Sequence, residues 1–92
     1  MAARIELTPT LTHCIETKAR QEFLKSKDEY MRSGGEDEQL EEKIELLRAF
    51  LESMDFRELR RQSEEYLTEG KNVRFILYLQ EGKPKYEMKV DQ

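Results

Sequence analysis

Apolar residues recur at helical spacing through the first third of the chain. Five of them share one broad face at about 100° per residue, and two more widen it: Leu11, Ile15, Ala19, Phe23 and Tyr30, with Leu24 and Met31. Thr8-Pro9 is a typical helix start, because threonine caps free N–H groups and proline suits the first helical position. Ser33-Gly34-Gly35 is a typical stop, because glycine accepts the left-handed conformation. The pattern predicts a helix over residues 9–33.

The middle of the chain carries a narrower apolar seam, with spacings of 4, 3, 4 and 3 along Leu40, Ile44, Leu47, Leu51 and Met54. This spacing is the a/d pattern of a helix that packs lengthwise on another helix. The carboxylates of Glu36-Asp37-Glu38 favour a helix start just before it, since a helix N-terminus is electropositive. Two partners fit the seam: the first helix, in a helical hairpin, or a second copy of the chain, in a dimer.

A third helix is predicted to begin at Asp55, because Glu58 follows three residues later, as in a capping box. The seam of the second helix is out of phase with the apolar face of the third, which predicts a bend near residues 53–55. Gly70 ends this third helix. Its inner face comprises Phe56, Leu59, Ser63, Tyr66 and Leu67.

The C-terminal segment predicts a β-hairpin. Residues 73–80 are rich in β-forming side chains, residues 85–90 alternate polar and apolar, and a turn is predicted at residues 81–84. Pairing Gln80 with Lys85 places the apolar side chains of both strands on one face. A slip of one residue would scramble both faces, so the alternation itself predicts the register.

The opposite face of this hairpin is the candidate partner surface. Residues 75–79 are apolar on both faces, as in a strand that is covered on both sides. Because the helices cover only one face, Ile76 and Tyr78 are either single exposed apolar residues, which need no explanation, or contacts for a partner on the other face. The candidate surface comprises Arg74, Ile76, Tyr78, Lys85 and Lys89.

Together these elements predict one small α+β domain over residues 1–92: a three-helix N-terminal and central bundle followed by a C-terminal antiparallel β-hairpin, with Arg4–Leu7 as a short additional strand. A chain of 92 residues with 37% hydrophobic side chains allows a single modest core. No apolar run approaches the roughly 18 residues of a membrane span, and residues 1–7 lack the apolar stretch of an export signal. We therefore expect a cytoplasmic protein without membrane contact.

Catalytic chemistry has little support in the sequence. His13, Cys14 and Glu16 are the only cluster of metal-capable residue types, and His13 and Glu16 fall on one face of the predicted first helix. A zinc site needs further ligands that no second motif supplies, so a buried structural thiol is favoured at Cys14. No phosphate-binding glycine loop or serine nucleophile elbow is present. We expect no catalytic residue, metal, cofactor or small-molecule substrate.

The expected function is that of a non-catalytic interaction module or small subunit, homodimeric through the outer face or edge of the hairpin or through the seam of the second helix. Nucleic-acid binding is one alternative, because Lys85 and Lys89 surround Tyr78 at the basic hairpin, although a pI of about 5.1 argues against it. A second alternative rests on residues 34–69, which carry five basic and twelve acidic side chains. Their acidic helix face would imitate nucleic acid toward a basic protein, and comprises Glu38, Glu41, Glu42, Glu45 and Glu52.

Overall fold

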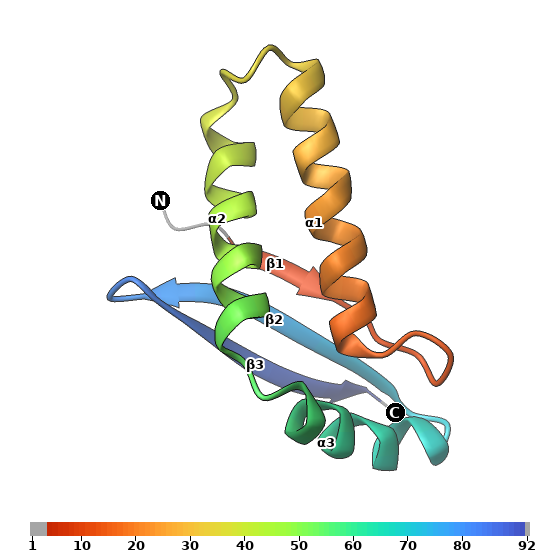
Figure 1. Ribbon diagram of the computed structural model, residues 1–92. Helices are drawn as coiled ribbons and strands as arrows, with labels where there is room; N and C mark the ends of the chain where they lie inside the picture. The colour runs from red at the N-terminus through yellow and green to blue at the C-terminus, as the bar shows by residue number, and fades with distance from the viewer. Residues whose placement is uncertain (1–3, 92) are drawn as a thin grey trace.

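A computed structural model describes residues 4–91, and its helices and strands are drawn in Figure 1. In Figure 1, α1 and α2 stand side by side as a helical hairpin over the sheet, and α3 follows the C-terminal end of α2. The fold is α+β, as predicted. In chain order the elements are β1 (Arg4–Leu7), α1 (Ile15–Arg32), α2 (Glu38–Ser53), α3 (Phe56–Thr68), β2 (Asn72–Gln80) and β3 (Lys83–Asp91).

The three strands form one antiparallel sheet in the order β1-β2-β3, so β2 is central. The pairing of β1 with residues 75–78 confirms the additional strand predicted at residues 4–7. Along β2, Val73, Phe75 and Leu77 are buried. Their even-numbered neighbours point to the opposite face, because successive side chains of a strand alternate. The helices therefore cover one face of the sheet.

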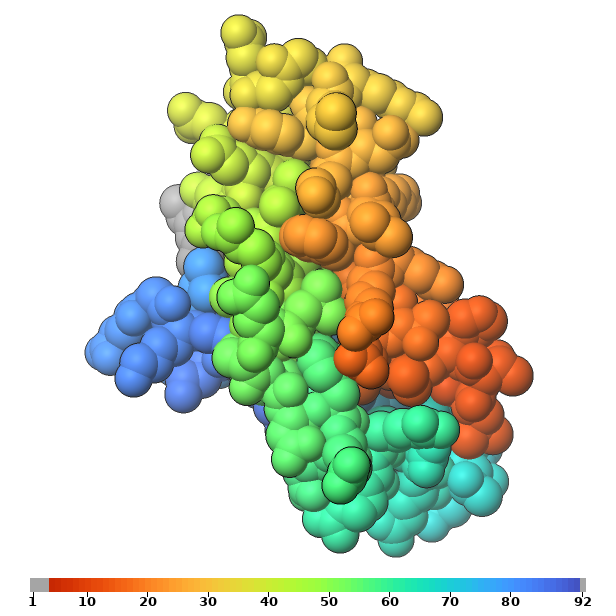
Figure 2. Space-filling view, in the orientation of Figure 1, coloured from red at the N-terminus to blue at the C-terminus, as the bar shows by residue number. Residues whose placement is uncertain are grey.

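The core lies between this sheet face and the helices. Leu47 of the α2 seam is fully buried, and Leu51 and Met54 pack against the core. The seam is thus used within one chain, and Figure 2 shows α1 and α2 in contact with each other. Within residues 4–91, no helix combines the length and the apolar character needed to cross a membrane. The buried apolar side chains are Ile5, Leu7, Ile15, Ala19, Leu46, Leu47, Phe50, Leu59, Val73, Phe75 and Leu77.

The register of the β2–β3 hairpin differs by two residues from the predicted one. Gln80 pairs with Lys83 rather than Lys85, and the chain turns through Glu81 and Gly82 alone. These two residues have φ angles of 54° and 76°, as a two-residue type I′ turn requires. A shift of two keeps every side chain on its predicted face, because the side-chain period of a strand is two. The alternation of apolar residues therefore excludes register shifts by an odd number of residues, and the turn determines which of the even shifts occurs.

The first helix begins later than predicted, at Ile15 rather than Pro9. The Thr10 hydroxyl accepts a hydrogen bond from the backbone N–H of His13 at 3.0 Å, and the Thr10 N–H donates to the His13 carbonyl oxygen at 2.8 Å. These local bonds hold the segment in a turn that competes with the helix. Leu11 therefore lies outside the helix and is 63% exposed.

The packed stripe of α1 is narrower than predicted. Leu24 and Met31, which were expected to widen it, are 65% and 76% exposed. The buried positions of the helix include the small residues Ala19 and Ser26. Because small side chains fill little volume, α1 buries only the row of residues that faces its neighbours.

The predicted end of the first helix and the predicted starts of the second and third helices are confirmed. Gly34, in the left-handed region, follows α1, and Asp37 and Asp55 cap α2 and α3 by accepting hydrogen bonds from backbone N–H groups. The reciprocal half of the capping box at Asp55 does not form. The Glu58 carboxylate instead accepts hydrogen bonds from the Arg61 guanidinium.

Candidate functional site

Among residues 4–91, no helix packs over the second face of the sheet. We call this surface the uncovered sheet face. All its side chains are half-buried or exposed, and it includes every residue of the predicted partner surface. It consists of alternate residues of the three strands: Arg4, Glu6, Asn72, Arg74, Ile76, Tyr78, Gln80, Lys83, Lys85, Glu87, Lys89 and Asp91.

Cross-strand pairing arranges the charges of this face into rows that run across the strands. The sign alternates over four of the five rows along β2, so that a positive row is followed by a negative one, then by a second positive and a second negative row. Each of the first two rows has an apolar or aromatic side chain at its centre, on β2. In order, these four rows are Arg4/Tyr78/Lys85, Glu6/Ile76/Glu87, Arg74/Lys89 and Asn72/Asp91. The fifth row, Gln80/Lys83, lies at the turn beside the first of them and is also positive.

Arg74 forms an ion-pair network that joins all three strands. Its Nε donates to Oδ2 of Asp91 at 2.7 Å, and its Nη1 donates to Oε1 of Glu6 at 3.0 Å. These bonds, first the one to Asp91 and then the one to Glu6, raise the pKa of Arg74 above its ordinary value. Two carboxylates of the same chain thus neutralise this arginine.

Ile76 and Tyr78 form the apolar centre of the face. Both are half-buried on the central strand. The Arg4 guanidinium lies 5.5 Å from the centroid of the Tyr78 ring, within the range of a cation–π contact. Ile76 lies between Glu6 on β1 and Glu87 on β3. A small apolar centre surrounded by charged side chains is the general arrangement of protein–protein interfaces.

β1 contributes two residues to this face that sequence reasoning missed, Arg4 and Glu6. The alternation of residues 4–7 predicts a strand but not its partner, and Glu6 is separated from Arg74 by 68 positions in the sequence. The available signal was the apolar pair Ile5 and Leu7, whose burial turns the alternating residues Arg4 and Glu6 outward.

The open edge of β3 is a poor docking site for another strand. Its outward side chains include Lys83, Lys85 and Lys89, and Pro84 lies within the strand. Lysines and proline on an edge strand oppose the addition of further strands. The uncovered sheet face is therefore a better candidate surface than the edge.

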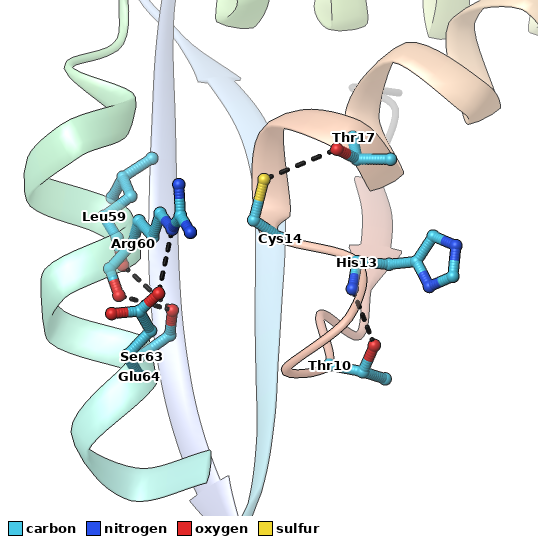
Figure 3. A network of polar contacts seen from close by, with 8 residues as sticks. All are labelled: Thr10, His13, Cys14, Thr17, Leu59, Arg60, Ser63 and Glu64. Atoms are coloured by element: carbon cyan, nitrogen blue, oxygen red, sulfur yellow. Dashed lines mark hydrogen bonds and ion pairs between the residues drawn. The ribbon is translucent and has the colours of Figure 1, made fainter. Parts of the chain in front are cut away.

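The predicted cluster of His13, Cys14 and Glu16 is not assembled. His13 lies before α1, and Figure 3 shows its imidazole pointing away from the Cys14 thiol. Glu16 accepts a hydrogen bond from Arg20 at 3.1 Å. The expectation that His13 and Glu16 share a helix face is wrong, because the helix begins only at Ile15. Within the described range, no three His, Cys, Asp or Glu side chains are grouped so that they could hold a metal ion.

Cys14 is the N-cap residue of α1 and is partly exposed, rather than buried within the helix. Its Sγ lies 3.4 Å from Oγ1 of Thr17. This contact lowers the pKa of the thiol below its ordinary value, whereas desolvation acts in the opposite direction. The backbone N–H groups of Thr17 and Glu16 and the charge of Arg60 also lower this pKa. Figure 3 shows Cys14 and Thr17 on α1, with Arg60 extending from α3.

We expect this lowered pKa to appear in the pH dependence of alkylation. The rate of reaction with iodoacetamide should reach half its maximum at a lower pH than that of an unstructured cysteine peptide, because the thiolate is the reacting form. Thr17→Val removes the main cause and should shift the midpoint upward. Thr12→Val, which removes a hydroxyl that does not contact the thiol, serves as control. A wild-type midpoint at or above that of the peptide would contradict this prediction.

The arginines of α3 are engaged within their own helix. Arg60 binds Glu64 at 2.8 Å, and Arg61 binds Glu58 at 2.7 Å. Such exposed intrahelical pairs contribute little to stability. The acidic face of α2 is exposed along its length, and comprises Glu38, Glu41, Glu42, Glu45 and Glu52.

The comparisons with known proteins concern the chain as a whole. Searches of curated proteins and of solved structures found no match. A protein-family model, in contrast, matches residues 1–88, which is nearly the whole chain. The chain therefore belongs to this family.

Proposed function

We propose that this protein is a non-catalytic interaction module that binds a protein partner through the uncovered sheet face. The observation that carries the proposal is the position of Ile76 and Tyr78. They lie side by side on one face of the central strand, half-exposed, with charged residues on both neighbouring strands. An apolar centre on a central strand gains free energy when a second surface removes it from water.

The charges of the face favour a protein over a nucleic acid. Tyr78 has the Arg4 guanidinium over its ring, so this ring face is already in contact and is not free to stack on a base. Arg74 is neutralised by Glu6 and Asp91. A surface for single-stranded nucleic acid presents free cations beside open aromatic rings, whereas mixed charges around an apolar centre suit a protein.

The seam of α2 is a weaker candidate for the same role. Its middle residue Leu47 is fully buried, and Leu51 and Met54 pack against the core of the same chain. A partner that used this seam would have to displace α1. The uncovered sheet face can bind a partner without any rearrangement of the fold.

A photo-crosslinking experiment tests the proposal. Tyr78→p-benzoylphenylalanine places a photoreactive ketone at the centre of the face, and irradiation of cells of the native source should produce covalent adducts with protein. Adding Ile76→Glu to the same chain should lower the adduct yield about tenfold, since substitutions of residues at the centre of an interface commonly cost more than 1 kcal/mol of binding free energy. The adducts are separated by mass and identified.

The matched control is Glu65→p-benzoylphenylalanine, at an exposed position on α3, which should yield no specific adduct. Nuclease-sensitive adducts at position 78 would replace the proposal with nucleic-acid binding. Adducts from position 65 whose acceptors and yields equal those from position 78 would also overturn it.

A further inference from the structure

We infer that the partner on the uncovered sheet face is a second copy of this chain, related by a two-fold axis that runs across the strands. This inference rests on the proposed function, and it specifies both the partner and its orientation. The alternating rows of charge carry the argument, because a two-fold dimer places the same surface against itself. The charges that surround the centre of the interface must then meet opposite charges of the same face.

A two-fold axis parallel to the strands fails this test. It places each row on the same row of the second copy, with β1 over β3. Arg4 would then face Lys85, and Glu6 would face Glu87, so that like charges meet in both rows. Juxtaposed like charges disfavour an interface. The row pattern therefore excludes this axis.

A two-fold axis perpendicular to the strands brings opposite charges together when it passes between the row of Tyr78 and the row of Ile76. In β2 it lies at the level of Leu77, so that Ile76 of each copy faces Tyr78 of the other. In β1, Glu6 faces Arg4 of the second copy. In β3, the same operation places Glu87 opposite Lys85, because cross-strand pairing aligns Leu77 with Tyr86. The two apolar residues meet at the centre, and opposite charges flank them on both sides. At the rim the same axis places Lys83 opposite Lys89; both lysines are exposed, so solvent screens this like-charge contact.

The size of the face sets the expected affinity. β2 and β3 are each nine residues long and β1 is four. Strands about 4.8 Å apart with about 3.3 Å per residue then give a surface of roughly 350 Å². This is less than the roughly 800 Å² that each partner buries in a standard interface. We therefore expect a reversible dimer with a dissociation constant in the micromolar range, about 1–100 µM.

The decisive experiment uses two single substitutions on β3. Glu87 and Lys85 are both exposed, and each lies on the edge strand. Sedimentation equilibrium measures the dimer dissociation constant of the wild type, of Glu87→Lys and of Lys85→Glu, followed by that of their mixture. Each variant alone creates two like-charge contacts across the axis and should weaken the dimer about fivefold or more.

The mixture should restore the wild-type affinity. In a mixed dimer, the lysine introduced at position 87 faces the glutamate introduced at position 85, and the native Lys85 of one chain faces the native Glu87 of the other. No other row alignment gives this rescue: an axis between the second and third rows would place position 87 opposite Lys89. Far-UV circular dichroism and urea midpoints establish that both variants are folded.

Three results would overturn the inference. A wild type that stays monomeric up to about 500 µM would exclude a dimer in the expected range. A tighter dimer for Glu87→Lys would indicate the axis parallel to the strands. Variants that weaken the dimer without rescue on mixing would indicate a different row alignment. If the wild type is monomeric while position 78 still crosslinks to another protein, the second copy is excluded and the proposed function stands.

Discussion

Replacing Phe75 with alanine is expected to remove about 3–5 kcal/mol from the free energy of unfolding, the range for large-to-small changes at buried aromatic residues. The side chain is 0% exposed on the central strand. It lies opposite Leu7 on β1 and Met88 on β3, and its ring centroid is 5.7 Å from that of Tyr86. The cavity would therefore open where all three strands meet the helices.

This loss is large compared with the total free energy of unfolding of a domain of this size. At about 0.05–0.15 kcal/mol per residue, a chain of 92 residues has a stability of roughly 5–14 kcal/mol. At the lower end of this range, Phe75→Ala would leave the protein close to its unfolding threshold. Urea denaturation followed by circular dichroism should show a lower midpoint with an unchanged slope.

Leu24→Ala is the matched control, because Leu24 is a large apolar residue that is 65% exposed on α1. Its removal should change the free energy of unfolding by no more than about 0.5 kcal/mol. Equal losses for Phe75→Ala and Leu24→Ala would mean that β2 is not the centre of the packed core.

The hairpin illustrates what a sequence pattern can and cannot determine. The alternation of residues 85–90 correctly assigns every side chain to a face, because a residue on the wrong face would bury a charge. The same alternation is unchanged by a shift of two residues. Only the turn distinguishes the two registers, and it depends on Glu81 accepting a positive φ before Gly82, a conformation that is uncommon for glutamate.

The start of the first helix shows a second limit. Thr8-Pro9 and Thr10 carry similar signals, because threonine side chains bond to nearby backbone groups in caps and in turns alike. The structure uses Thr10 in a turn with His13, and Pro9 is buried. The burial of a proline against the rest of the fold is a tertiary effect, which local propensity does not contain.

The candidate site was predicted in part for the same reason. Ile76 and Tyr78 were recognisable because a strand that is apolar on both faces stands out in the sequence. The row pattern was not recognisable, because it requires Arg4 and Glu6 from a strand at the other end of the chain. The sign already alternates along β3, through Lys85, Glu87, Lys89 and Asp91, but the matching charges of Arg4 and Glu6 join these rows only once β1 pairs with β2.

Phe50→Ala is expected to produce a loss of the same size, about 3–5 kcal/mol, for a different structural reason. Phe50 is 0% exposed near the end of α2. Its ring meets that of Phe56, in the first turn of α3, edge to face, with centroids 5.4 Å apart and planes at 85°. This pair joins two helices that are separated only by Met54 and Asp55.

A double-mutant cycle separates this ring contact from simple burial. Edge-to-face aromatic pairs contribute about 0.5–1.5 kcal/mol beyond the area they bury, so Phe50→Ala and Phe56→Ala together should cost less than the sum of their separate losses by about that amount. The combination of Phe50→Ala with Leu24→Ala should be additive, because Leu24 is exposed on another helix. Additivity of the two phenylalanine substitutions would show that the bend between α2 and α3 is held by helix capping at Asp55 rather than by the aromatic pair. In that case, Asp55→Ala would change the helix content more than Phe50→Ala or Phe56→Ala does.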